Sequence, residues 1–108
     1  MPNLLFICSR NQLRSPTAEA VFAALPGIET DSAGLADDAA CPLDADQLAW
    51  ADLICVMEKR HRALLTRRFK HHLKGKKLVC LDIPDNYSYM QPELVQLLQQ
   101  RVPRHLVL

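Results

Sequence analysis

The sequence predicts an α/β protein, a three-layer sandwich in which a four-stranded parallel sheet carries helices on both faces. Three observations indicate this fold class: short apolar runs alternate with helix-like segments, the runs are almost continuously apolar, and the connections between them are short. Continuous apolar runs are typical of strands buried on both faces of a parallel sheet. With 108 residues, of which 49% are hydrophobic, we expect one domain over residues 1–108.

The first three elements follow from local signals. Residues 3–8 (NLLFIC) have the composition of a buried strand. A helix is expected next, because Ser15 is a good N-cap residue and Pro16 fits the first helical position. Proline and glycine at 26–27 end that helix, and residues 28–33 then predict a second, weaker strand.

The remaining elements continue the alternation. After a loop, Asp44 can cap a short helix, and Pro92 can begin the last helix. The basic helix between the third and fourth strands carries apolar residues along one face and is closed by a glycine. We expect, in order, a short helix over 44–50, a strand over 52–57, a helix over 59–73, a strand over 77–82 and a helix over 92–101.

Composition restricts the class of protein. The apolar run over 4–8 is too short to cross a membrane and has no basic leader or cleavage site, so we expect a cytoplasmic protein with no membrane partner. The cysteines are dispersed, which suits reduced thiols, and no pair has the spacing of a zinc site. We therefore expect neither a metal nor another cofactor. The cysteines are Cys8, Cys41, Cys55 and Cys80.

Cys8 ends the first predicted strand, at the sheet edge where parallel α/β proteins bind ligands. A cysteine is nucleophilic as the thiolate, and a helix N-terminus and a nearby cation both favour that form. The residues after Cys8 must turn from strand to helix, so their backbone N–H groups can converge on an anion. The predicted phosphate-binding loop consists of Ser9, Arg10, Asn11, Gln12, Leu13, Arg14 and Ser15.

These residue types predict phosphoryl transfer. The planar guanidinium of Arg14 can hold two oxygens of a tetrahedral anion, and the Ser15 hydroxyl can hydrogen-bond the sulfur. The sulfur would attack phosphorus in line to give a phosphocysteine, which water then hydrolyses. The leaving group needs a proton, and Asp82 and Asp85, close to the end of the last strand, are the two candidate acids.

The stretch "CSRNQLRSPTAE" over 8–19 resembles the motif Cys-x-Gly-Asn-x-Cys-Arg-Ser-Pro of the low-molecular-weight protein tyrosine phosphatases. The stretches "DSAG" (31–34), "ADLICVM" (51–57) and "IPDNY" (83–87) are similar to later segments of that family. The resemblance implies that Cys8 is the nucleophile. It also implies a phosphate ligand at Arg14, a thiolate stabiliser at Ser15, loop support from Asn11 and Ser32, a general acid at Asp85 and a pocket-lining Tyr87.

The sequence departs from the family pattern at several points. Arg10 stands where the motif has glycine, which predicts a strained or reshaped loop if that position requires a positive φ. Leu13 replaces the second motif cysteine, so we do not expect that cysteine pair to protect the nucleophile from oxidation. Gln12 is unusual at a position that influences leaving-group preference. The segment after "DSAG" is shortened, and a histidine that the family places there has no match.

We expect a cysteine-dependent phosphomonoester hydrolase, with tyrosine phosphate as the leading substrate class and a phosphorylated protein or a small phosphomonoester as the partner. One alternative is a phosphate- or phosphoprotein-binding module without turnover. Another is nucleic-acid binding by the basic segment 59–77, which holds nine of the thirteen Lys and Arg residues. Such a segment is more often a solvated face, so we do not expect a nucleic-acid partner. An acidic or phosphorylated protein could also dock there.

Overall fold

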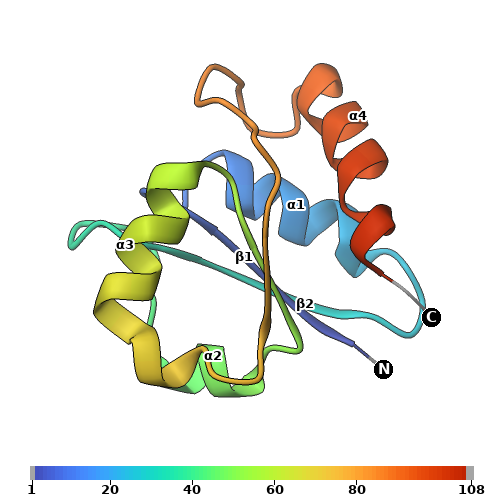
Figure 1. Ribbon diagram of the computed structural model, residues 1–108. Coiled ribbons are helices and arrows are strands. Elements are labelled where there is room, and N and C mark those ends of the chain that lie inside the picture. Colours follow the sequence, from blue (N-terminus) through green and yellow to red (C-terminus); the bar gives the residue numbers. More distant parts are fainter. Residues whose placement is uncertain (1, 107–108) are drawn as a thin grey trace.

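A computed structural model describes residues 2–106 of the chain (Figure 1). The strands are β1 (Asn3–Cys8), β2 (Glu29–Gly34), β3 (Leu53–Val56) and β4 (Lys77–Cys80). The helices are α1 (Arg14–Ala23), α2 (Ala45–Trp50), α3 (Lys59–Phe69) and α4 (Pro92–Arg101), and 3-10 turns cover Lys70–His72 and Pro103–His105. Every predicted element is therefore present, in the predicted order.

The four strands form one parallel sheet with the order β2-β1-β3-β4. In its register, Cys8 at the end of β1 pairs with Gly34 at the end of β2, and Val56 of β3 pairs with Cys80 of β4. The carboxyl ends of all four strands consequently meet at one edge of the sheet. Loops from this edge surround the site described below.

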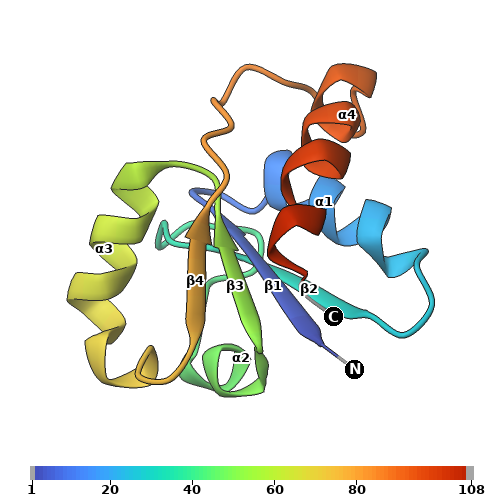
Figure 2. The ribbon, with the colours of Figure 1, turned by 45° about the vertical axis from the view of Figure 1, so that its right-hand side comes forward.

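Helices cover both faces of the sheet, which confirms the predicted α/β sandwich. Helices α1 and α4 lie on one face, and α2 and α3 lie on the other (Figures 1 and 2). Side chains alternate along β1 because successive residues of a strand point to opposite faces. Leu4 and Phe6 pack with Phe22 of α1, while Leu5 and Ile7 belong to the second core on the other face.

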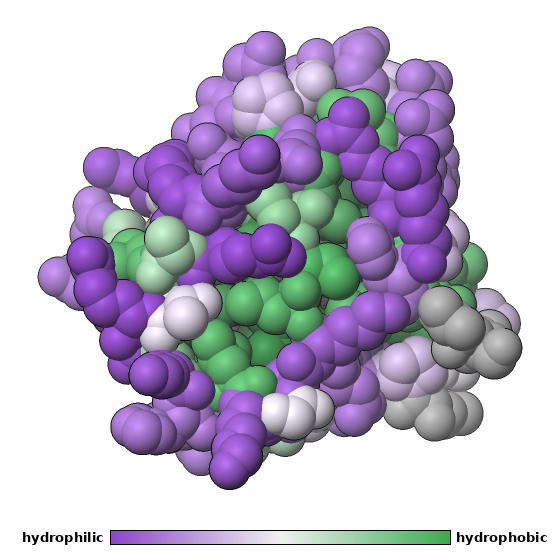
Figure 3. All heavy atoms as spheres, viewed as in Figure 1, coloured by the Kyte–Doolittle hydropathy of each residue, from purple (hydrophilic) through white to green (hydrophobic). Residues whose placement is uncertain are grey.

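Strand β4 is one edge of the sheet, and its outer side has no neighbouring strand among the described residues. The surface seen in Figure 3, from the viewpoint of Figure 1, has a hydrophobic area in its middle that is framed by hydrophilic side chains. Across residues 2–106, none of the helices combines the length and the apolar composition needed to span a bilayer.

The start of α1 corrects the prediction that Ser15 is its N-cap. The helix begins at Arg14, the capping position is Leu13, and no side chain caps it. The capping role is lost because the Ser15 hydroxyl is directed into the preceding loop, where it contacts the Cys8 sulfur. In contrast, Asp44 caps α2 as expected, since its carboxylate accepts a hydrogen bond from the Gln47 backbone N–H.

Candidate active site

The loop between β1 and α1 curls around the sulfur of Cys8. The backbone N–H of Asn11 donates a hydrogen bond to the sulfur at 3.3 Å. Asn11 adopts a left-handed conformation with φ of 56°, which asparagine tolerates better than most residues. Arg10 is not among the residues with a positive φ, so the strain expected from replacing the motif glycine does not arise at Arg10.

The Ser15 hydroxyl is fully buried and lies 3.0 Å from the Cys8 sulfur. The Asn11 side-chain amide donates to the Ser15 oxygen at 2.9 Å, which leaves the serine proton free to donate. The sulfur is the nearer acceptor, because the Ala33 carbonyl oxygen lies at 3.5 Å. Two donors therefore point at the sulfur, and such donors stabilise a thiolate more than a thiol.

The Arg14 side chain is 2% exposed and is fixed by partners on one side of its guanidinium. Its Nη1 donates to Glu58 Oε2 at 2.6 Å and to the Ile83 carbonyl oxygen at 2.7 Å. Its Nε lies 3.7 Å from Asp85 Oδ1, too far for a hydrogen bond. No hydrogen bond from residues 2–106 engages Nε or Nη2, so this edge is free to hold two oxygens of an anion.

Glu58 is a site residue that the sequence analysis missed. It lies two residues after the end of β3, and its carboxylate contacts both Arg14 and Arg60. The hydrogen bonds from Arg60, and then those from Arg14, lower the pKa of Glu58 to about 2 against the opposing effect of burial. Glu58 is thus a permanent anion that holds the Arg14 guanidinium in place. The only signal for it in the sequence was an acidic residue directly after the predicted strand over 52–57.

His61 of α3 is a second missed residue and also contacts the loop. Its Nδ1 accepts the backbone N–H of Glu58 at 3.1 Å, so a neutral ring carries its proton on Nε2. Nε2 lies 2.9 Å from the Ser9 hydroxyl and donates to it, which leaves the Ser9 proton available to an anion.

We expect His61 to make the fold sensitive to mild acid. Burial, followed by the charges of Arg14 and Arg60, lowers the pKa of His61 from 6.5 to about 4. Between these values the unfolded chain binds the proton more readily, so the free energy of unfolding falls as the pH drops from 6.5 towards 4, by about 2–3 kcal/mol in total. Urea unfolding of wild type and His61→Gln at pH 7 and pH 4.5 measures this. The variant should lose less stability between the two pH values, and equal losses would contradict the assignment.

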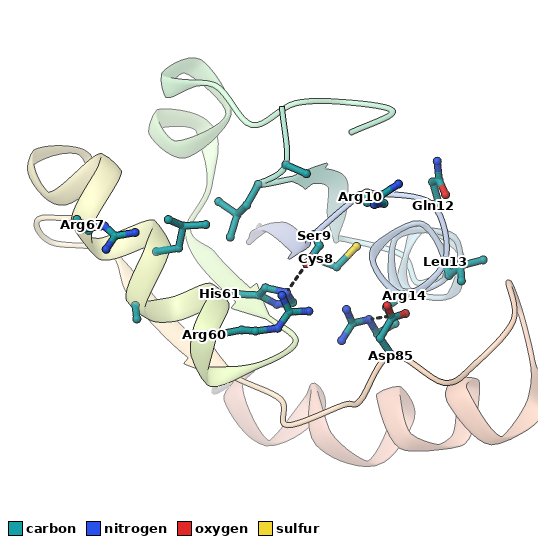
Figure 4. Close-up of a pocket in the computed structure, with 14 residues that line it drawn as sticks. Cys8, Ser9, Arg10, Gln12, Leu13, Arg14, Arg60, His61, Arg67 and Asp85 are labelled. Atoms are coloured by element: carbon teal, nitrogen blue, oxygen red, sulfur yellow. Dashed lines mark hydrogen bonds and ion pairs between the residues drawn. The ribbon is translucent and has the colours of Figure 1, made fainter. Parts of the chain in front are cut away.

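A cavity of about 700 Å³ opens above the loop, between α1 and α3 (Figure 4). Cys8 lies at its inner end and is 3% exposed. Arg14 and Asp85 also line it, so the structure brings together all three residues predicted to be catalytic. The full lining is Cys8, Ser9, Arg10, Gln12, Leu13, Arg14, Leu35, Ala36, Arg60, His61, Ala63, Leu64, Arg67 and Asp85.

The structure separates the two candidate acids. Asp85 faces the cavity with its side chain 57% exposed and its carboxylate next to Arg14. Asp82 lies in a different polar hollow beside Arg101 and does not line the cavity of Cys8. The position of Asp85 therefore fits a proton donor to a group bound at Cys8.

Two predicted supporting residues lie elsewhere. The Ser32 hydroxyl donates to the Glu19 carboxylate and has no described hydrogen bond to the loop. Tyr87 is half-buried against the core under α1 and α4 and is not part of the cavity lining, which corrects its predicted position. In β2, the strand that contains Ser32, the residue that approaches the loop is Gly34. A Cβ at Gly34 would lie 2.7 Å from the Ser9 carbonyl oxygen, so only glycine fits there.

The other cysteines lie outside the cavity. Cys55 is fully buried in β3, and burial raises its pKa to about 12, so it stays protonated and unreactive. Cys41 is exposed and Cys80 is half-buried, and neither lines the cavity. Among residues 2–106, Cys8 is therefore the one thiol in this cavity.

No protein-family model and no curated protein matches this sequence. Solved structures match over almost the whole chain. The YwlE arginine phosphatase from Geobacillus stearothermophilus is 23% identical with a TM-score of 0.78, covering 98% of this chain and 93% of that one. The Erwinia amylovora tyrosine phosphatase AmsI is 27% identical with a TM-score of 0.75, and the match covers 96% of this chain and 91% of AmsI. The tyrosine phosphatase Wzb from Escherichia coli K30, in complex with phosphate, is 24% identical with a TM-score of 0.76, and the match covers 97% of this chain and 96% of Wzb.

Proposed function

The chain has the fold of the low-molecular-weight protein tyrosine phosphatases, and from this premise we propose that it is a cysteine-dependent phosphomonoester hydrolase, a single domain over residues 1–108 that acts in the cytoplasm. The observation that carries the proposal is the geometry at Cys8. Its sulfur accepts hydrogen bonds from the Asn11 N–H and the Ser15 hydroxyl, and the free guanidinium edge of Arg14 lies at the same cavity. This arrangement combines two hydrogen-bond donors to the sulfur with a site for a tetrahedral anion.

The reaction proceeds through a phosphocysteine. The Cys8 thiolate attacks phosphorus in line as the bond from phosphorus to the ester oxygen breaks, and Asp85 gives its proton to the departing oxygen. Loop N–H groups and Arg14 stabilise the negative charge on the equatorial oxygens. Asp85 then takes a proton from a water that attacks the phosphocysteine, which releases phosphate and restores the thiolate. No step requires a metal.

The charge of the cavity favours an aryl phosphate over a phosphoarginine. Besides Arg14, the lining contains Arg10, Arg60 and Arg67, whereas Asp85 is its one carboxylate among the described residues. Arg10 and Arg60 are ion-paired with Asp38 and Glu58, so the like charge that a guanidinium leaving group would meet comes mainly from Arg67. A tyrosine ring can pack on the aliphatic lining. Tyrosine phosphate, on a protein or a small molecule, is therefore the leading substrate, and phosphoarginine is the comparison suggested by the arginine phosphatase of the same fold.

Hydrolysis of a generic aryl phosphate in the presence of a chelator tests the proposal. Turnover at rates well above the background supports an enzyme, whereas phosphate binding without turnover supports the alternative of a binding module. Parallel assays with a phosphotyrosine peptide and a phosphoarginine peptide then decide the substrate class. A higher kcat/KM for phosphoarginine would overturn the preference for tyrosine phosphate.

We expect Asp85→Asn to affect poor leaving groups far more than good ones. A phenolate of high basicity needs the proton, so kcat/KM, which reports formation of the phosphocysteine and not its later hydrolysis, should fall by about 10²–10³ for phenyl phosphate and by less than about tenfold for a nitrophenyl phosphate. Steady-state kinetics with the two substrates measures this ratio. Asp82→Asn is the matched control, because Asp82 lies outside the cavity. Equal losses for both substrates, or a larger effect of the Asp82 variant, would reject Asp85 as the acid.

A further inference from the structure

The cavity extends beyond the phosphate-binding loop along one face of α3. Arg60, Ala63, Leu64 and Arg67 all line it. Their spacing of three, four and seven residues places them in one stripe of the helix. At 1.5 Å of rise per residue, Arg60 and Arg67 are about 10 Å apart along the helix axis. The stripe is therefore longer than the phosphate site alone requires.

The opposite wall of this groove comes from the segment after β2. Leu35 and Ala36 form this wall, so the lining of the groove between the loop and the end near Arg67 is aliphatic. Arg68 Nη1 donates to the Leu35 carbonyl oxygen at 2.7 Å, which ties α3 to this segment. The two walls are thus connected by a hydrogen bond, and the groove is a built feature of the fold. Figure 4 shows Arg67 on α3 at the end remote from Cys8.

The arginines of the groove differ in whether their charge is already paired. Arg60 donates to both carboxylate oxygens of Glu58, at 3.3 and 3.1 Å. Arg10 lies 3.5 Å from Asp38 in an exposed ion pair. Arg67 is exposed and has no ion pair or side-chain hydrogen bond to any part of the chain that the structure describes. The far end of the groove therefore carries an uncompensated positive charge.

We propose that this groove, from Cys8 to Arg67, binds a phosphopeptide with an acidic residue two or three positions from the phosphorylated one, and that Arg67 holds the acidic side chain. The inference rests on the proposed function. An extended peptide advances about 3.3 Å per residue, so two or three residues cover most of the distance along the stripe. The aliphatic lining accommodates the intervening residues of the peptide, and the guanidinium of Arg67 can bind a carboxylate with two parallel hydrogen bonds.

The test compares two phosphotyrosine peptides that differ only in having Glu or Gln at the second and third positions on both sides of the phosphotyrosine. For the wild-type protein at low salt, kcat/KM should be about three- to tenfold higher for the Glu peptide, and the difference should shrink as salt is added. In Arg67→Gln the preference should fall to about one, with each rate normalised to the variant's own turnover of an aryl phosphate. Lys70→Gln is the control, because it removes the same charge near the end of α3 outside the groove.

The outcomes separate the two proposals. If wild type shows no preference, or if Arg67→Gln keeps it, the groove proposal is wrong even when aryl phosphate is hydrolysed. If Lys70→Gln loses the preference equally, the effect is general surface charge and the proposal also fails. If no substrate is turned over, the proposed function fails, and the same two peptides are then compared by calorimetric binding. Tighter binding of the Glu peptide that depends on Arg67 would still support the groove.

Discussion

Replacing Cys8 by serine is expected to reduce kcat for an aryl phosphate by at least about 10⁴-fold while phosphate binding remains measurable. A serine hydroxyl is hardly ionised at neutral pH and cannot replace the thiolate as nucleophile. The groups that hold the anion are retained, because the loop backbone and Arg14 come from other residues. In the structure the Asn11 N–H already points at the position of the sulfur, and the serine oxygen can accept it.

Steady-state kinetics and calorimetry with inorganic phosphate measure the two halves of this prediction. Cys41→Ser is the matched control, because Cys41 is exposed and lies outside the cavity. It should keep wild-type activity. Residual turnover of Cys8→Ser within about tenfold of the wild type would show that another group attacks phosphorus. Loss of phosphate binding together with loss of the folded state would instead assign Cys8 to the core.

Arg14→Lys is expected to lower kcat/KM for an aryl phosphate by about 10²–10⁴-fold although the positive charge is retained. The guanidinium uses Nη1 for Glu58 and the Ile83 carbonyl, and it keeps its other edge for the anion. A lysine side chain has a single nitrogen, Nζ. If that nitrogen stays with Glu58, it cannot present two parallel N–H donors to the transferring phosphoryl group.

Arg101→Lys is a suitable control for this substitution. Arg101 Nη1 donates to the carbonyl oxygens of Leu81 and Asp82, so it also fixes backbone, but at a separate hollow. Both variants should show similar losses in thermal stability, and only Arg14→Lys should lose phosphate affinity and turnover. If the two variants had equal activity, bidentate binding by Arg14 would not be part of the mechanism.

The sequence was sufficient to predict the fold because the two central strands, β1 and β3, are buried on both faces. Such strands appear as continuous apolar runs, and the helices between them are marked by local signals such as the cap at Asp44. The loop could also be predicted, since Cys8, Asn11 and Arg14 lie within one short segment. The helix start was misplaced at Ser15 because that hydroxyl has a tertiary partner, the sulfur, which a local cap rule does not consider.

The rest of the site depends on contacts between distant segments. Glu58 and His61 lie more than forty residues from the loop residues that they contact, Arg14 and Ser9. No local pattern specifies these pairs, and the basic composition of α3 indicated a solvated face. The structure shows that one side of α3 supports the loop and another lines the groove. Tyr87 was misplaced for a related reason, because its ring packs on the core instead of the cavity.

The most direct test of the account is to trap the covalent intermediate. The protein is mixed with an excess of aryl phosphate, quenched rapidly in acid and digested, and the phosphorylated peptide is identified by mass spectrometry. We predict phosphate on the peptide that contains Cys8, formed in a burst within the first turnover and absent from Cys8→Ala. Turnover with no phosphorylated enzyme, or with the phosphate on another residue, would contradict the central claim that the Cys8 sulfur is the nucleophile.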